Sequence, residues 1–392
     1  HLPFCPVRCL YCACHTTVTH DSERIDRYLD TLELEMDLVT DHLGRGRALS
    51  QLYLGGGTPN YLSDSQLIRL MDMLTKRFRV AAETVTTIEC SPRRASAGQL
   101  ELLKGLGFTR LSFGIQDLDA RVQQAIGRVN SLGLVRDVYD TARTIGFENI
   151  SLDLIYGLPK QSVESFESTL ARVIEIAPDR VRCFSYSHSP AARPHQYAIE
   201  TGGLPGAQDK LTLLHSAVRC FTEAGYHWLG VDCFARDGDD LVDAKAAGTL
   251  RHTCLGYTSA ATRHLVGLGS SSLGEVDRVF IQNRANVDAW RKDLEAGRFP
   301  IQCGYRMSDA DRRHRNAMHL LMCNLEVPAS LASDLQPECE RLNQWQEHGL
   351  VEIGSDCIKV TQRGRYFLRS LCTPHEVSVA WSSNQWGVPP LS

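Results

Sequence analysis

Three cysteines near the start of the chain have a spacing that fits iron–sulfur chemistry. Cys5, Cys9 and Cys12 form a C-x3-C-x2-C pattern in the stretch HLPFCPVRCLYCAC. Three thiolates can hold three irons of a 4Fe-4S cluster and leave the fourth iron open to another ligand. A closed structural zinc site needs four protein ligands, and Cys14 could supply the fourth. The pattern therefore predicts an open iron–sulfur site, with a fully ligated metal knot as the alternative.

A glycine run, Gly55-Gly56-Gly57-Thr58-Pro59, is the second feature that could support chemistry. Glycines lack a Cβ, so their backbone groups can approach a bound ligand closely. Such a run taken alone could equally be a tight connection between a strand and a helix. Because it follows the cysteines by one predicted strand, we interpret both features as parts of one cofactor site.

The elements that must position these residues alternate between strands and helices. Apolar side chains at three- and four-residue intervals predict a helix over 21–43, and Ser63 with Gln66 predicts a capping box. Strands are predicted over 52–54, 84–90, 110–115, 151–155 and 182–186, with helices over 63–74, 99–106, 120–145 and 211–224 and one through Phe166, Leu170 and Val173. With a first strand ending at Phe4, this order predicts an α/β fold with a partial (β/α)6 barrel, whose sites lie at the carboxyl ends of the strands.

The pattern changes after about Gly274. Helices are predicted over 308–323, 331–348 and 362–371, with a hairpin over 350–360. We therefore assign 1–280 to the barrel and 281–392 to a mainly helical, winged-helix-like C-terminal domain with a polar tail. A winged helix can bind DNA, but the acidic charge balance favours a structural role.

Composition narrows the class of protein. The chain has 392 residues and a net charge of -4, from 42 Lys and Arg against 46 Asp and Glu. Without a basic run or a long apolar stretch, we expect neither nucleic acid nor a membrane as partner, and a cytoplasmic setting. The 14 cysteines are mostly scattered, which favours reduced thiols over a disulfide framework. The chain starts at His1 inside an apolar strand, so we expect a further N-terminal segment to precede it.

The cysteine and glycine segments together resemble those of radical S-adenosylmethionine enzymes. The stretches LYLGGGTPNYL, RLSFGIQDLD, LDLIYGLPKQ, GYTSAATRHLVGLG and GLVEIGSDCIKVTQRGR resemble, in order, the oxygen-independent coproporphyrinogen III dehydrogenase family. The resemblance implies an oxidoreductase of heme biosynthesis, which decarboxylates two propionates of coproporphyrinogen III to give protoporphyrinogen IX. It also implies a tetrapyrrole substrate and an electron donor such as flavodoxin or ferredoxin, and we expect a monomer.

The same resemblance implies a set of cofactor-binding residues. Cys5, Cys9 and Cys12 would bind the 4Fe-4S cluster, while Cys14 matches a cysteine of the family that is not an iron ligand. Two S-adenosylmethionine molecules would be bound, the first by Gly56, Glu89, Ser187 and Leu273, and the second by Tyr11, Gly57, Thr58, Gln116, Arg128 and Asp153. The residue types agree, because carboxylates can accept ribose hydroxyls and a guanidinium can pair with a methionine carboxylate. No catalytic side chain is assigned.

Three positions depart from the family pattern. Cys254 and Leu255 stand where the family commonly has Phe-Gln, and Cys233 stands where it commonly has His. These departures keep open a related radical methyltransferase or cyclopropanase that uses the second S-adenosylmethionine. A heme chaperone is the third reading, although such relatives usually show Phe where Cys14 stands.

Overall fold

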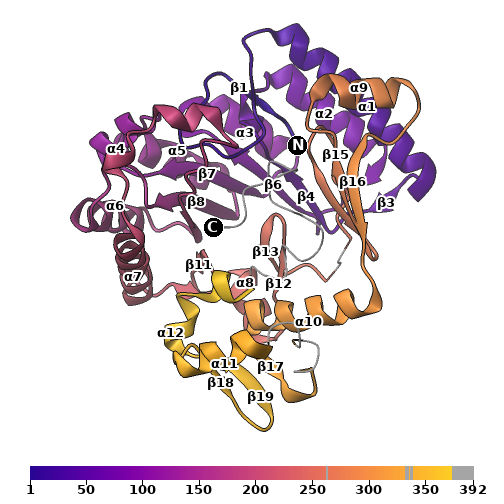
Figure 1. Cartoon of the computed structure of the whole chain (residues 1–392). Helices are drawn as coiled ribbons and strands as arrows, with labels where there is room; N and C mark the ends of the chain where they lie inside the picture. The colour runs from indigo at the N-terminus through magenta and orange to yellow at the C-terminus, as the bar shows by residue number, and fades with distance from the viewer. Residues whose placement is uncertain (262–263, 332–334, 336–338, 373–392) are drawn as a thin grey trace. The chain divides into compact units, whose positions relative to one another are not determined.

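The chain folds into two compact units, shown in a computed structural model that describes residues 1–261, 264–331, 335 and 339–372 (Figure 1). The first unit comprises His1–Leu118, Gly127–Asp153 and Thr262–Gly304, and the second comprises Asp119–Ile126, Leu154–Ala261 and Tyr305–Ser392. Each unit is thus assembled from segments that are far apart in the sequence. The domain boundary after residue 280 stays a prediction.

A parallel sheet forms the centre of the first unit. β4 (Gln51–Leu54), β6 (Val85–Cys90) and β7 (Arg110–Gln116) pair in parallel, and β8 (Asn149–Tyr156) is next in the strand order. Helices follow these strands as the alternation predicts: α2 (Asp64–Thr75), α3 (Ala97–Gly105) and α5 (Leu132–Ile145). The short 3-10 turns are η1 (Pro59–Tyr61) and η2 (Pro92–Arg94). The predicted α/β class is confirmed.

The N-terminal segment is not a full strand of this sheet, which corrects the expected first βα unit. β1 (Phe4–Cys5) pairs in parallel with β2 (Thr17–Val18), and Leu2 makes an isolated parallel bridge to Gly56. The segment therefore lies along the glycine turn instead of extending the sheet. Its apolar side chains still reach the core, since Leu2 is 2% and Phe4 is 1% exposed.

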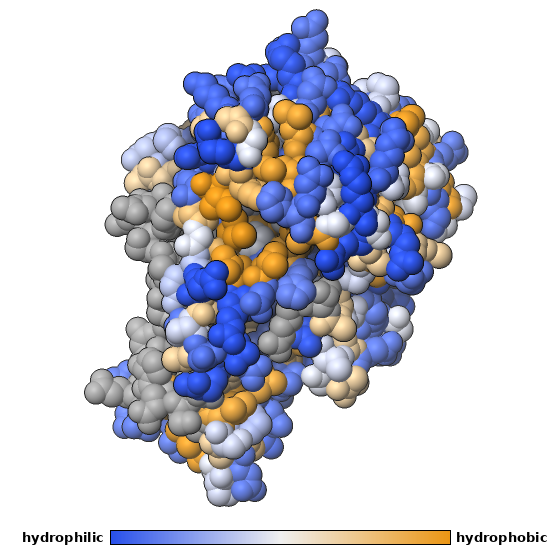
Figure 2. Space-filling view, turned by 90° about the vertical axis from the view of Figure 1, so that its right-hand side faces the viewer, coloured by the Kyte–Doolittle hydropathy of each residue, from blue (hydrophilic) through white to orange (hydrophobic). Residues whose placement is uncertain are grey.

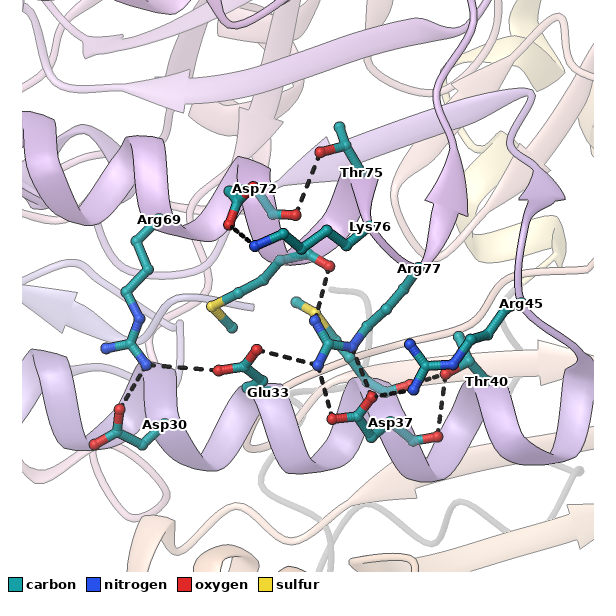
Figure 3. Close-up of polar contacts among 12 residues, drawn as sticks. Asp30, Glu33, Asp37, Thr40, Arg45, Arg69, Asp72, Thr75, Lys76 and Arg77 are labelled. Atoms are coloured by element: carbon teal, nitrogen blue, oxygen red, sulfur yellow. Dashed lines mark hydrogen bonds and ion pairs between the residues drawn. The ribbon is translucent and has the colours of Figure 1, made fainter.

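Helix α1 (Ser22–Leu43) confirms the helix predicted over 21–43, and its caps are Asp21 and Gly44. It lies beside α2 and α9 (Val287–Glu295). Ion pairs tie α1 to the segment around α2 (Figure 3). The guanidinium of Arg77 donates to Asp37 at 2.7 Å and to Glu33 at 3.1 Å. Ser63 and Gln66 form the predicted capping box of α2.

A small sheet that the sequence did not predict completes the first unit. β14 (Leu273–Val276) and β15 (Val279–Asn283) form an antiparallel hairpin, and β16 (Ile301–Arg306) adds to β15. Trp290 of α9 is fully buried in this region. The two-stranded sheet of β3 (Arg47–Ala48) and β5 (Phe78–Arg79) lies elsewhere in the same unit.

The second unit combines strands with helices on a different pattern. β9 (Arg180–Ser185) confirms the predicted strand, but it pairs antiparallel with β11 (Cys233–Ala235), which pairs with β10 (His227–Trp228). Its helices are α4 (Ala120–Ala125), α6 (Val163–Ile176), α7 (Ala207–Glu223) and α8 (Asp240–Ala246), with 3-10 turns η3 (Pro194–Ala198) and η4 (Thr201–Gly203). A short hairpin joins β12 (Arg251–Thr253) to β13 (Gly256–Thr258).

The C-terminal part of this unit contains the predicted hairpin. β18 (Val351–Ile353) pairs with β19 (Cys357–Val360), and β17 (Glu326–Pro328) joins the other edge of β19. The helices here are α10 (Asp309–Asn324), α11 (Cys339–Glu347) and α12 (Gln362–Arg365). The predicted helix over 362–371 is interrupted by a turn after Arg365. Parts of the predicted helix over 331–348, and the whole tail from 373, lie outside the described residues.

The surface is mainly hydrophilic on the face shown in Figure 2, with hydrophobic residues gathered in a few patches. Within the part of the chain that the structure describes, no helix combines the length and the apolar character that crossing a membrane requires.

Candidate functional site

The cysteine loop places two of its thiols beside groups that stabilise negative charge. Cys5 and Cys9 are both buried. The Thr58 hydroxyl lies 3.3 Å from the sulfur of Cys5, and an Nη of Arg128 donates to the sulfur of Cys9 at 3.6 Å. Burial raises the pKa of Cys5, and the hydrogen bond from Thr58 opposes this shift. The loop is also held internally, because the Cys12 N–H donates to the Cys9 carbonyl.

Cys12 and Cys14 share a hydrogen bond that shifts the pKa values of their thiols in opposite directions. A hydrogen bond with Cys14 lowers the pKa of Cys12 to about 7, and the same bond raises the pKa of Cys14. Cys12 is half-buried, whereas Cys14 is exposed. Of these two thiols, Cys12 ionises more readily, and it is one of the three predicted iron ligands.

The N-terminal segment packs so closely on the glycine turn that a side chain would clash with it at Gly56 or Gly57. A Cβ on Gly57 would lie 2.6 Å from the carbonyl oxygen of Phe4, and one on Gly56, whose φ is +122°, would lie 2.5 Å from the His1 ring. The contact is reinforced by backbone pairs, including Gly57 N–H to the Leu2 carbonyl at 2.9 Å and Thr58 N–H to the Phe4 carbonyl at 2.9 Å. This pairing brings Thr58 to Cys5.

Glu89 is held at the end of β6 against the same turn. The Tyr53 hydroxyl donates to one carboxylate oxygen of Glu89 at 2.6 Å, and the Gly56 N–H reaches the other at 3.2 Å. Tyr53 was not among the predicted site residues. It lies on β4 beside β6, and a polar aromatic residue just before the glycine run was the signal that could have found it.

Asp153 of β8 is held by a second hydroxyl that the sequence did not predict. Ser112 of β7 donates to both carboxylate oxygens of Asp153, at 3.1 and 3.0 Å. Ser112 is the register partner of Glu89 across β6 and β7. The two carboxylates are therefore arranged across three successive strands of one sheet.

Arg128 and Gln116 converge where β7 ends. An Nη of Arg128 donates to the Gly114 carbonyl at 2.8 Å, while its Nε is buried without a hydrogen-bond partner. A Cβ on Gly114 would lie 2.7 Å from the Gln116 amide nitrogen and 3.1 Å from Arg128. Gly114, another unpredicted residue, thus makes room for both side chains. Gln116 has φ +70°, a strained conformation for a residue other than glycine.

Leu273 and Ser187 come from different units. Leu273 starts β14 in the first unit and pairs in register with Gln282. Ser187 follows β9 in the second unit, where buried Gln196 donates to the Ser187 carbonyl at 3.3 Å. All other predicted cofactor residues lie in the first unit: Cys5, Cys9, Cys12, Tyr11, Gly56, Gly57, Thr58, Glu89, Gln116, Arg128 and Asp153.

The donor set fits an iron–sulfur cluster with an anionic ligand beside it. Among the described residues, no three His, Cys, Asp or Glu side chains converge as ligands of a single ion. A cluster accepts its thiolates at separate iron corners, so this spacing is compatible with it. The partnerless Nε of Arg128 is a buried donor that a bound carboxylate would satisfy.

Comparisons with known proteins agree with this chemistry. Residues 1–173 match the model of the Radical SAM superfamily. The oxygen-independent coproporphyrinogen III oxidase of Pseudomonas aeruginosa is 35% identical over 386 residues, which cover 95% of this chain and 83% of that protein. The chain belongs to the oxygen-independent coproporphyrinogen III oxidase family. As a radical SAM protein it uses a 4Fe-4S cluster and S-adenosylmethionine.

Other members of the coproporphyrinogen oxidase family match equally well. The Escherichia coli K12 protein is 35% identical over 381 residues, covering 95% of this chain and 83% of that protein. The solved structure of the Escherichia coli enzyme, described as a radical SAM enzyme, superposes with a TM-score of 0.89 at 34% identity, covering 96% of this chain and 89% of that one. The likeness therefore includes both units.

Proposed function

We propose that the protein decarboxylates coproporphyrinogen III to protoporphyrinogen IX in anaerobic heme biosynthesis. The observation that carries this is the similarity to coproporphyrinogen oxidases along 95% of the chain, which includes the segments beyond the radical SAM match. Each of two propionates would lose a hydrogen atom from its β-carbon, carbon dioxide, and one electron to an acceptor, which leaves a vinyl group.

The chain's own residues would bind and orient the cofactors. When bound, the reduced cluster and S-adenosylmethionine supply an adenosyl radical that can remove hydrogen from an unactivated carbon. We assign Cys5, Cys9 and Cys12 as iron ligands, with Thr58 and Arg128 stabilising the charge on two of the thiolates. The buried sulfurs of Cys5 and Cys9 are also shielded from water and oxygen.

We assign one carboxylate to each of the two S-adenosylmethionine molecules that the family resemblance implies. Glu89, held by Tyr53 and the Gly56 N–H, has lone pairs left to accept ribose hydroxyls of the molecule on the iron. Asp153 would do the same for the second molecule, with Arg128 pairing its methionine carboxylate. The remaining contacts are Ser187, Leu273 and Gly56 for the first molecule, and Tyr11, Gly57, Thr58 and Gln116 for the second.

The finer properties of the enzyme are part of the same proposal. The substrate is a tetrapyrrole whose propionates react, and the electron donor is a small flavin or iron–sulfur protein such as flavodoxin or ferredoxin. We expect the protein to act as a monomer without nucleic acid. The cytoplasmic setting stays a prediction.

One specific observation keeps a second function in view. Cys254 and Leu255, two of the departures from the family pattern, form the exposed turn of the β12–β13 hairpin, and Cys233 is buried on β11. A thiol, an aliphatic chain and a thiol there would suit a more apolar substrate. A methylating or cyclopropanating relative would cleave S-adenosylmethionine yet leave the propionates intact.

The decisive test uses coproporphyrinogen III labelled at its propionate carboxyls. The anaerobically reconstituted protein, with S-adenosylmethionine and a reductant, should release labelled carbon dioxide and yield protoporphyrin fluorescence after oxidation. The Cys9→Ala variant serves as the control for background decarboxylation. S-adenosylmethionine cleavage without labelled carbon dioxide would reject the proposed function and favour the methylating one.

A further inference from the structure

A buried carboxylate outside the proposed contact set points to a role in cofactor binding. We propose that Glu35 of α1 is a positioning residue for the iron-bound S-adenosylmethionine, acting through the loop Leu268–Ser272, here the serine loop, which leads directly into Leu273. The proposal rests on the cofactor part of the proposed function and not on the identity of the substrate.

Three donors from separate elements converge on the Glu35 carboxylate. One oxygen accepts the Gly269 N–H at 2.6 Å and the Trp290 indole N–H at 3.2 Å, and the other accepts the Asn283 amide at 2.5 Å. Glu35 is 1% exposed. It therefore joins α1, the serine loop, β15 and α9 at one buried point.

The serine loop has little freedom to adopt another conformation. Gly269 has φ +95°, and a Cβ there would lie 2.5 Å from both the His1 carbonyl oxygen and the Tyr28 hydroxyl. The Asn283 amide also donates to the Gly269 carbonyl at 2.9 Å and reaches the Ser272 hydroxyl at 3.0 Å. The bond to Glu35 thus fixes the most constrained residue of the loop.

The same loop contacts the N-terminal segment that packs on the glycine turn. The His1 main-chain nitrogen donates to the Leu268 carbonyl at 2.8 Å, and Tyr28 donates to the His1 carbonyl at 2.8 Å while accepting the Ser270 N–H at 3.0 Å. Since the His1 ring lies against Gly56, a displaced loop would disturb both Leu273 and Gly56. Both residues are proposed contacts of the iron-bound molecule.

Two substitutions at Glu35 separate positioning from simple stability. Glu35→Met keeps the volume but leaves the Gly269 N–H and the Trp290 indole N–H buried without their acceptor, which is costly, while Asn283 keeps its two bonds to the loop. Glu35→Gln can still accept from Gly269 and Trp290, but Asn283 must turn its amide and lose its bonds to the loop. Arg77→Gln is the control, because it removes the buried anchor between α1 and the α2 segment without touching the loop (Figure 3).

The readout is the S-adenosylmethionine concentration that perturbs the EPR signal of the reduced cluster, measured beside cluster absorbance and the thermal midpoint. We expect that concentration to rise at least about tenfold in Glu35→Met and about threefold in Glu35→Gln, with cluster absorbance retained. Arg77→Gln should lower the thermal midpoint and leave the concentration unchanged.

Several results would overturn the proposal. Wild-type binding in Glu35→Met with a lowered midpoint would make Glu35 purely structural, and so would equal weakening in Arg77→Gln. If Glu35→Met does not fold, wild-type binding in Glu35→Gln decides against the proposal on its own. Failure of the wild type to decarboxylate coproporphyrinogen would leave this measurement intact, because the measurement needs only the cluster and S-adenosylmethionine.

Discussion

The cysteine and glycine segments of the first unit contrast with the β12–β13 hairpin of the second. Around Gly56 and Gly57, an added Cβ would approach neighbouring atoms to 2.5 and 2.6 Å, respectively. At the hairpin turn, Cys254 is exposed and Leu255 is 40% exposed. The first region tolerates few residue types, whereas the second can change without disturbing its fold.

This difference accounts for the family pattern kept at the cysteine and glycine segments and for the departures at Cys254 and Leu255, but not for the departure at Cys233, which is 4% exposed. At the glycine turn, close packing and backbone hydrogen bonds exclude most residue types, so the family motif is still recognisable there. An exposed turn carries little folding energy, so its residues are set by what they face in solution or in a complex. The hairpin departures lie outside the residues that we assign to the cluster and to S-adenosylmethionine.

The largest expected effect is loss of the cluster. Replacing Cys5, Cys9 or Cys12 singly with Ala should abolish the visible absorbance of the reconstituted protein and its cleavage of S-adenosylmethionine, because three thiolates are needed to hold three irons. Cys14→Ala is the matched control and should keep the cluster. If Cys14→Ala also fails to bind the cluster, the result would instead support a metal site that is fully ligated by four cysteines.

The next largest effect is expected from a substitution in the glycine turn. Gly57→Ala would push a Cβ toward the Phe4 carbonyl, and we expect it to destabilise the protein by about 2 kcal/mol and to weaken S-adenosylmethionine binding. Gly98→Ala in α3 has open space around its Cβ and should be neutral or slightly stabilising. Chemical denaturation measures the free energy of unfolding of both variants. Equal values would contradict the close packing proposed around Gly57.

The two carboxylates should affect different S-adenosylmethionine molecules. Glu89→Gln should suppress radical formation, since Glu89 on β6 accepts the Gly56 N–H of the glycine turn, while Asp153→Asn should remove one bound equivalent and spare the EPR response of the cluster. Equilibrium dialysis of the anaerobic wild type should find two equivalents. One equivalent in the wild type would contradict the two-molecule arrangement.

A smaller effect is expected from the pH dependence of stability. Burial raises the pKa of Glu35 to about 7, against the opposing effect of its hydrogen bonds. The folded state then binds a proton more tightly than the unfolded state between about pH 4.5 and 7, so this residue makes stability fall as pH rises through that window. Glu35→Gln should flatten this part of the curve of thermal midpoint against pH. An unchanged slope would show that Glu35 is ionised throughout the window.

Sequence reasoning predicted the elements with strong periodicity or capping, such as α1, the capping box of α2, and the hairpin of β18 and β19. It missed features that depend on contacts between distant segments. Tyr53 and Ser112 act only because β4, β6, β7 and β8 are neighbours, and the first strand was misplaced because apolar pattern alone does not reveal its partner. Glu35 lies on the buried face of a well-predicted helix, but its partners lie more than 200 residues away.

The smallest effect on folding is expected at the hairpin, where it tests the comparison directly. Restoring the family pair with Cys254→Phe and Leu255→Gln should change the free energy of unfolding by less than about 0.5 kcal/mol, because both side chains are exposed in a two-residue turn. Cys233 differs, since it is 4% exposed and burial raises the pKa of its thiol to about 12, so an imidazole there must be accommodated within the core. If the protein decarboxylates coproporphyrinogen, the hairpin double variant should be equally or more active, because the reaction depends on radical placement and the propionates can be held by other polar groups. A double variant that folds normally but loses carbon dioxide release would show that Cys254 and Leu255 are adapted to this chain's own substrate.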